Sequence, residues 1–395
     1  MKCPHCGESL RYRERSNQTC SKCHQRFALE PKLDPLKLSD RKLRSLAERL
    51  SRKGVYRYTI AHLYHAAILQ WVKHIYRERF SWPYKTSLSD ILYQSRLTQI
   101  ALIGLTGIWF FFYLESQTFS ASGFWPTIKM IFGGCGILAM ATPAAVAELI
   151  GKIRGSGKLP DVSLADFEHK CLAPWEMMYG QLPGKIDSAD VLRLRASFSN
   201  PPRHRIRAFI VSPNEDILDC LRANDLPQRL GVALINPDHP LTGEMEDLVR
   251  FARNNPRLPI LMIHDASVWG CLLPYLLPAK WGLTADHRVI DLGLRPHHVR
   301  QLQLPWRYER VPSELRRLLD NVARKPDNPF LHRDEVDWLR EGSVASALFI
   351  PPSKLIAVVT KTVKQTAPRL VDPEVEAQAQ ARAIGFMTWP QQSVR

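Results

Sequence analysis

The chain has 395 residues, enough for two or three domains, and carries a formal net charge of +16 with an isoelectric point near 9.6. This charge favours anionic partners and suits lipid headgroups and nucleic acid equally well. Four of its eight cysteines stand in one tight N-terminal cluster, and the other four are scattered among apolar residues: Cys135, Cys171, Cys220 and Cys271. That distribution excludes a disulfide framework.

Two C-x-x-C pairs, Cys3 with Cys6 and Cys20 with Cys23, stand thirteen residues apart within the first 30 residues. Each pair can present two thiolates to one ion, and Gly7 relieves the turn after the first pair. This stretch resembles a zinc ribbon, in which the four cysteines would hold a structural Zn²⁺ and leave no position for water or substrate. A redox dithiol pair is the competing interpretation. The ribbon's own ligand, nucleic acid or protein, stays open.

Residues 39–96 are predicted to form a basic amphipathic helical region. Leucines recur at helical spacing in Ser39–Lys53, and a second helix is expected at about Thr59–Phe80, with His62 and His65 as ordinary helix residues. The opposite face of the first helix carries six basic side chains: Arg41, Lys42, Arg44, Arg49, Arg52 and Lys53. We expect this face either to be solvated or to contact phosphates, above all those of anionic membrane lipids.

Two long apolar stretches, Leu97–Leu114 and Met130–Ile150, predict a transmembrane helical hairpin over residues 97–150. Each stretch can cross a hydrocarbon core of roughly 30 Å at about 1.5 Å per residue. Lysines and arginines flank the hairpin, whereas the loop Glu115–Ile128 has none. The positive-inside rule therefore predicts a two-helix, multi-pass protein of the bacterial inner membrane with both termini in the cytoplasm.

Residues 151–204 are expected to form a linker and helices, and residues 205–310 an α/β domain. Short apolar strands alternate there with helices, which predicts a mainly parallel, Rossmann-like sheet covered on both faces. The expected strands are Ile206–Val211, Gly231–Ile235, Pro259–His264 and Arg288–Leu292. Residues 311–370 are predicted to be mainly helical, and residues 371–395 are predicted to form a flexible tail. The predicted fold class is thus a multidomain α/β membrane protein.

The run Asp265–Gly270 after a strand, followed by the turn Leu292–Pro296, is similar to motifs of the Toprim domain of the topoisomerase VI A subunit. The resemblance implies a Mg²⁺ site made by a glutamate after the first strand and two aspartates in the later turn. In this chain Ser212 and Ser267 stand at two of those three positions, and Asp265 alone remains. The domain is therefore expected to be an inactive, degenerate copy.

We accordingly expect a binding or scaffold subunit for nucleic acid or protein rather than an enzyme. The first alternative is a Mg²⁺-dependent, nuclease-like enzyme in which Asp265 acts with Glu215 or Asp216. A second is an inactive receiver-like signalling module, because Ser212 and Asn236 stand where a receiver domain needs acidic residues. A sensor of the envelope is a third. No small-molecule substrate is suggested, since nucleotide-binding glycine loops and common hydrolase motifs are absent from the sequence.

Overall fold

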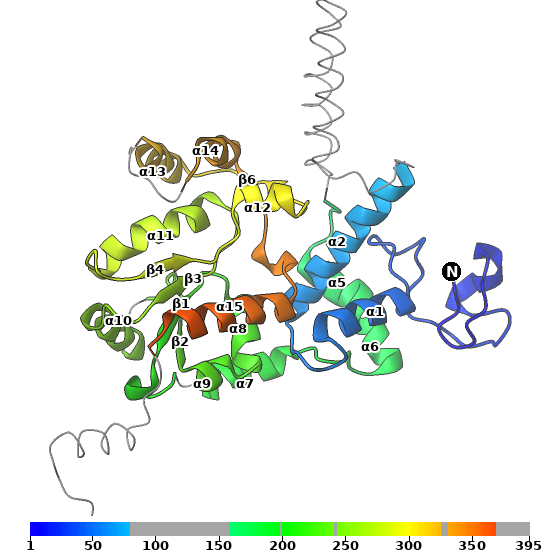
Figure 1. Ribbon diagram of the computed structural model, residues 1–395. Helices are drawn as coiled ribbons and strands as arrows, with labels where there is room; N and C mark the ends of the chain where they lie inside the picture. The colour runs from blue at the N-terminus through cyan, green and yellow to red at the C-terminus, as the bar shows by residue number, and fades with distance from the viewer. Residues whose placement is uncertain (80–158, 198–199, 241–242, 325–330, 369–395) are drawn as a thin grey trace, which may run out of the picture. The chain divides into compact units, whose positions relative to one another are not determined.

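The computed structural model describes residues 1–79, 159–197, 200–240, 243–324 and 331–368 (Figure 1). Two compact units are distinguished, Met1–Gln70 with Pro160–Arg395, and Trp71–Leu159. The first unit holds nearly all of the described residues. It combines the cysteine-rich N-terminus, a group of helices and an α/β domain.

A parallel four-stranded sheet forms the centre of the α/β domain. Its strands are β1 (Ala208–Val211), β2 (Val232–Ile235), β3 (Ile260–Met262) and β4 (Val289–Asp291), in the order β2-β1-β3-β4. Phe209 of β1 is in register with Ala233 on one side and Ile260 on the other. Every residue of β1, β2 and β3 is buried, as expected for parallel strands with helices on both faces. The predicted parallel α/β domain is therefore confirmed.

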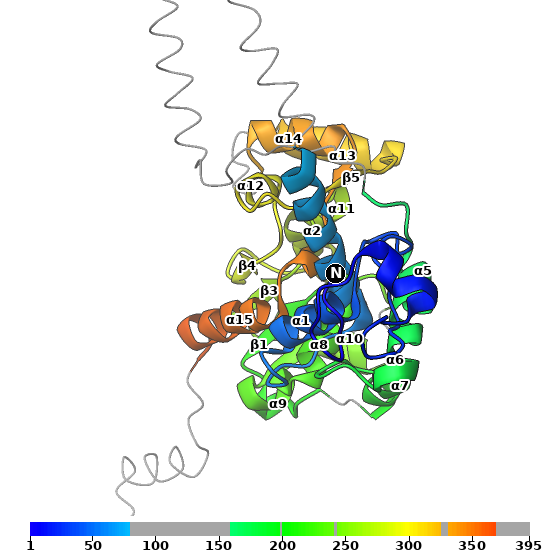
Figure 2. The same cartoon turned by 90° about the vertical axis from the view of Figure 1, so that its right-hand side faces the viewer.

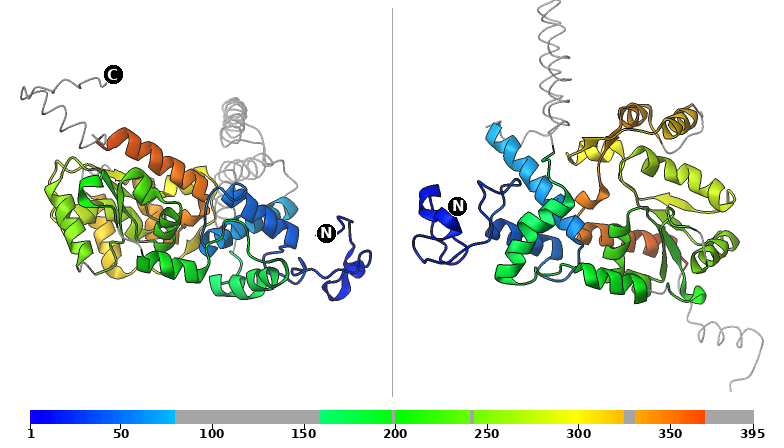
Figure 3. Two further views of the ribbon diagram at one scale, coloured as in Figure 1. Left: turned by 90° about the horizontal axis from the view of Figure 1, so that it is seen from below. Right: turned by 180° about the vertical axis from the view of Figure 1, so that it is seen from behind.

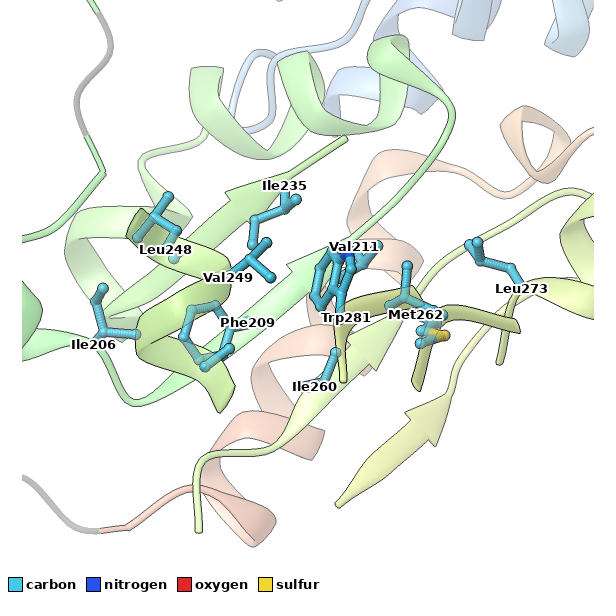
Figure 4. Close-up of a cluster of buried hydrophobic side chains, with 13 residues drawn as sticks. Ile206, Phe209, Val211, Ile235, Leu248, Val249, Ile260, Met262, Leu273 and Trp281 are labelled. Atoms are coloured by element: carbon cyan, nitrogen blue, oxygen red, sulfur yellow. The ribbon is translucent and has the colours of Figure 1, made fainter. Parts of the chain in front are cut away.

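Helices cover both faces of this sheet. They are α8 (Glu215–Ala223), α9 (Leu226–Leu230), α10 (Glu244–Asn254) and α11 (Val268–Trp281). Side chains of α10 and α11, among them Leu248 and Trp281, pack against Phe209 and Ile260 in one buried cluster (Figure 4). The connection from β1 to β2 moves towards one edge of the sheet, whereas the connections from β2 to β3 and from β3 to β4 move towards the other edge. Because such crossovers are right-handed, α8 lies on the face opposite α10 and α11.

Side-chain caps begin two of these helices where the strands end. The Asn214 Oδ1 accepts the Asp216 N–H at 3.1 Å and starts α8 directly after β1. The Ser267 Oγ accepts the Gly270 N–H at 3.0 Å and starts α11 after β3. Each cap satisfies a backbone donor that has no partner inside its helix.

The C-terminal part of the chain packs against the α/β domain. It contains α12 (Pro296–Gln301), α13 (Ser313–Ala323), α14 (Arg333–Arg340), the strands β5 (Arg307–Tyr308) and β6 (Ser343–Val344), the 3-10 turn η4 (Ala347–Phe349) and α15 (Pro352–Thr366). Helices α13 and α14 lie beside α11 and share a buried apolar cluster with it (Figures 1 and 2). Helix α15 packs against α1 and α9.

The N-terminal helical group is held together by backbone pairing and is joined to the α/β domain by an asparagine clamp. Its elements are η1 (Tyr12–Gln18), α1 (Asp40–Ser51), α2 (Ile60–Arg79), α5 (Leu164–Phe167), η2 (Glu168–Leu172), α6 (Ala173–Tyr179) and α7 (Ser188–Ser197), with the short turn η3 (Arg203–Arg205). Tyr58 pairs with the 184–186 segment through two backbone bonds of 2.9 Å. The Asn224 amide both accepts from the Arg57 N–H and donates to the Arg57 carbonyl, each at 2.9 Å.

The membrane expectation is corrected. Among the described residues, no helix combines the length and the apolar character that crossing a bilayer requires. The strongly apolar α11 has 14 residues and so spans about 21 Å, short of a hydrocarbon core of roughly 30 Å. The predicted spans, 97–114 and 130–150, lie outside the described residues. This finding contradicts both the membrane fold class and the inner-membrane localisation, which rested on apolar length and on the distribution of lysines and arginines around the two stretches.

Gly184 offers a first test of how the segment 184–186 packs against the end of α1 and the residues that follow it. Its φ is +75°, and an added Cβ would lie 2.6 Å from both the Ser51 Cβ and the Tyr56 carbonyl oxygen. We expect Gly184→Ala to lower the free energy of unfolding by about 2–4 kcal/mol, from backbone strain plus overpacking. Gly54→Ala is the matched control: its φ is +92° with open space around it, so only the strain of about 1–2 kcal/mol applies. Equal losses in urea titrations of the two variants would contradict this packing.

Two buried histidines predict acid sensitivity. Burial lowers the pKa of His62 to about 3 and the pKa of His65 to about 4. In the unfolded chain both titrate near about 6.5, so below that pH the unfolded state binds more protons than the folded state. The free energy of unfolding should therefore fall by roughly 1.4 kcal/mol per pH unit for each histidine as the pH drops from 6.5 towards 4.

The variant His62→Phe keeps the ring volume and removes one of these protonation sites. Urea titrations at several pH values should show a shallower loss of stability for the variant than for the natural chain, by roughly 1.4 kcal/mol per pH unit. An unchanged slope would show that His62 does not stay neutral in the folded protein.

Candidate metal centre and the basic surface beside it

The four N-terminal thiols lie close together. The Sγ atoms of Cys3, Cys6, Cys20 and Cys23 are all within 4.8 Å of one another. The Cys3 and Cys23 sulfurs are 3.7 Å apart, and those of Cys6 and Cys20 are 3.9 Å apart. A tetrahedral site with Zn–S bonds of about 2.3 Å places its sulfurs about 3.8 Å apart. The cluster is therefore compatible with a zinc ribbon and could hold a metal ion such as Zn²⁺.

The two cysteine pairs have the same local backbone. The Cys3 N–H donates to the Glu8 carbonyl at 2.8 Å, and the Cys20 N–H donates to the Gln25 carbonyl at 3.0 Å. The residue after the second cysteine of each pair has a left-handed backbone, with φ of +78° at Gly7 and +54° at His24. His24 thus occupies in the second pair the position that Gly7 has in the first.

Backbone donors favour the thiolate form, which a metal requires, at Cys20. The Cys23 N–H, the first of several causes, lowers the pKa of Cys20 to about 7. The Lys22 N–H lies 3.4 Å from the Cys20 sulfur. Backbone N–H groups also act on Cys6 and Cys23, but desolvation and neighbouring thiols outweigh them and raise both pKa values. Because thiolates rather than thiols bind Zn²⁺, Cys20 is the one of these three that is favoured as a ligand at neutral pH.

The carboxylate of Asp40 fixes the ribbon (residues 1–30) to α1 and α6, an anchor that the sequence did not reveal. Asp40 is buried at the start of α1, where its two oxygens accept the N–H groups of Ala28 at 2.9 Å and Leu29 at 2.8 Å. The Tyr179 hydroxyl donates to the same carboxylate at 2.6 Å. The ribbon accordingly lies beside α1 and α6 (Figures 1 and 3).

A hollow of about 670 Å³ lies between the ribbon and these helices. It is lined by residues 3–7 of the first cysteine pair, by the first turns of α1 and by Trp175 and Tyr179 of α6. Arg41 and Arg44, both exposed and one helical turn apart, stand at this hollow. The Arg44 guanidinium carbon lies 5.7 Å from the ring centroids of both Trp175 and Tyr179, in the range of cation–π contacts.

The positive charge is concentrated in this part of the chain. The first 70 residues contain 15 lysines and arginines against 6 aspartates and glutamates, so they carry a net +9 of the total +16. Five side chains of the predicted basic face of α1 and its C-terminal end are exposed: Arg41, Arg44, Arg49, Arg52 and Lys53. The sixth, Lys42, is half-buried. We call the five exposed residues and the adjoining ribbon the basic surface.

The three acidic residues considered for Mg²⁺ are held by other partners. Asp265 accepts the Ala347 N–H at 2.6 Å and so positions the turn η4. Glu215 accepts from Arg222 at 2.6 Å and from Asn236 at 2.8 Å. Burial, the largest cause, raises the pKa of Asp216, whose carboxyl group is hydrogen-bonded by the Thr59 side chain. In the part of the chain that the structure describes, the four cysteines are the only cluster of three or more potential ligands close enough to share a metal ion.

A smaller hollow of about 330 Å³ lies at the carboxyl ends of β1 and β3 and is lined by Glu215, Asp265 and Trp269 among others. Ligands of parallel α/β sheets often bind at such a point, where the chain turns in opposite directions from neighbouring strands. Here both carboxylates already accept hydrogen bonds from protein donors. The hollow therefore lacks a group of free ligand atoms for a cation.

The Leu292–Pro296 turn that carried the Toprim resemblance has a packing role. The buried His264 ring lies between Asp291, at 3.0 Å from its Nε2, and the Asp265 carbonyl oxygen, at 2.9 Å from its Nδ1. A Cβ on Gly293 would lie 2.3 Å from that ring. The His264 ring therefore leaves no space for a side chain at position 293. This packing explains the glycine without a metal site nearby.

Comparison with known proteins gives no match: the chain matches no protein-family model, no curated protein and no solved structure. Nothing therefore supports the Toprim-like domain expected from the sequence, and that assignment is withdrawn. The cysteine cluster and the surface around it are the features of this chain that point to a function.

The cysteine cluster predicts about one tightly bound Zn²⁺ per chain. Cys20→Ser should remove most of the metal, because three thiolates no longer close the tetrahedron, whereas Cys271→Ala, a buried cysteine of α11, should keep it. Metal analysis of the purified full chain measures both. Loss of metal in neither variant, or in both alike, would exclude the four-thiolate site.

Proposed function

We propose that this chain is a zinc-ribbon binding protein that recognises nucleic acid through its basic surface. The observation that carries the proposal is the net charge of +9 in the first 70 residues, displayed on a ribbon and helix that are fixed to each other. Lysine and arginine side chains that neutralise phosphates release counterions, and this release drives nucleic-acid binding.

The ion in this proposal has a structural role. Four thiolates would fill a tetrahedral site, so no coordination position is left for a substrate. The metal would hold the ribbon rigid, while the Asp40 carboxylate keeps it against α1. Catalysis by Asp265, Glu215 or Asp216 has less support, since these carboxylates do not belong to a described cluster of metal ligands.

Salt dependence tests the proposal. Affinity for DNA or RNA should fall with rising salt, with a slope of the double-logarithmic plot of about −0.9 for each phosphate contact. The double variant Arg41→Gln/Arg52→Gln should flatten that slope by about 1 to 2. Arg257→Gln/Arg310→Gln removes the same charge from two exposed positions of other segments and should leave the slope nearly unchanged.

Fluorescence-anisotropy titrations of the full, zinc-loaded chain provide the measurement. Equal effects of the two double variants would mean that net charge alone, rather than the basic surface, attracts nucleic acid. No binding at low salt would refute the proposed function altogether.

A further inference from the structure

We infer that the hollow between the ribbon and α1 receives an unpaired base of a single-stranded nucleic acid, with Arg44 as its stacking platform. The inference rests on the proposed function and names the form of nucleic acid that the basic surface selects. Three features of the hollow point to it: its size, its aromatic and guanidinium wall, and the mixed polarity of its lining.

The size suits a single nucleotide. At about 670 Å³ the hollow falls within the range of pockets that enclose small organic ligands, roughly 300–1,000 Å³. A base stacked inside a duplex cannot enter such a space without unpairing, and unpairing costs a few kcal/mol. A single strand presents its bases without that cost, so the hollow favours it.

The wall of the hollow carries the side chains that stack on bases. Arg44 lies over Trp175 and Tyr179, which fix its guanidinium group beside the hollow. Planar guanidinium groups and aromatic rings bind unpaired bases in a sequence-tolerant way. Arg41, one turn away, is placed to neutralise a neighbouring phosphate.

The lining offers acceptors as well as donors. The exposed Glu48 contributes carboxylate oxygens that accept, while the exposed Ser45 contributes a hydroxyl that can donate. A phosphate only accepts hydrogen bonds, whereas a base edge presents donors and acceptors together, so the mixed lining fits a base better than a phosphate.

The test compares an oligothymidylate of about a dozen nucleotides with its duplex on the full, zinc-loaded chain. We expect the single strand to bind about tenfold or more tightly than the duplex at the same salt. Arg44→Lys keeps the charge and removes the planar group, so it should weaken single-strand binding about tenfold and leave duplex binding and the salt slope nearly unchanged. Arg49→Lys, an exposed arginine of the same helix, is the matched control and should have little effect.

A duplex that binds as tightly as the single strand, or equal losses in the Arg44→Lys and Arg49→Lys variants, would overturn the inference while leaving nucleic-acid binding intact. Absence of binding to either probe would refute the proposed function as well. Metal content and the urea midpoint of each variant, compared with those of the natural chain, show whether a loss comes from the platform or from unfolding.

Discussion

The buried carboxylate of Asp40 is the interaction on which the N-terminal half of the structure depends. It accepts two backbone N–H groups from the end of the ribbon and the hydroxyl of Tyr179 from α6. Hydrogen bonds to a charged acceptor contribute about 1.5–3 kcal/mol each, and a buried carboxylate without them would be strongly unfavourable. One side chain therefore sets the position of the cysteine cluster relative to α1, and with it the hollow between them.

The same principle explains why the acidic residues of the α/β domain do not form a cation site. Asp265 and Glu215 stand at the carboxyl ends of parallel strands, where ligands of such sheets bind. Asp265 instead accepts the Ala347 N–H from the C-terminal segment, and Glu215 accepts from Arg222 and Asn236. Carboxylates satisfied by protein donors fix loops and helix ends, and Asp265 thereby ties the C-terminal segment to the end of β3.

The sequence predicted the features that depend on local pattern. The parallel strands were predicted from short apolar runs, and the cysteine cluster was predicted from the spacing of the two pairs. Both patterns involve residues that are close together in the sequence. The Asp40 anchor joins residues 139 positions apart through Tyr179, and no local pattern records such a contact. The Toprim expectation failed because a short glycine turn has several physical causes, and at Gly293 the cause is the His264 ring. The membrane expectation, drawn from apolar length and flanking charge, is contradicted because no described helix combines the length and the apolar character of a membrane span.

The arrangement around Arg44 separates two roles of positive charge. Exposed lysines and arginines such as Arg52 and Lys53 attract any polyanion, whatever its sequence or form. The strength of that attraction depends on how many phosphates they neutralise and is reduced by salt. Arg44 is held over two aromatic rings, so its orientation is defined before a ligand arrives and less side-chain entropy is lost on binding. Under the proposed function, attraction and selection would therefore reside in different residues of one surface, and a ribbon free to move relative to α1 would retain only the first.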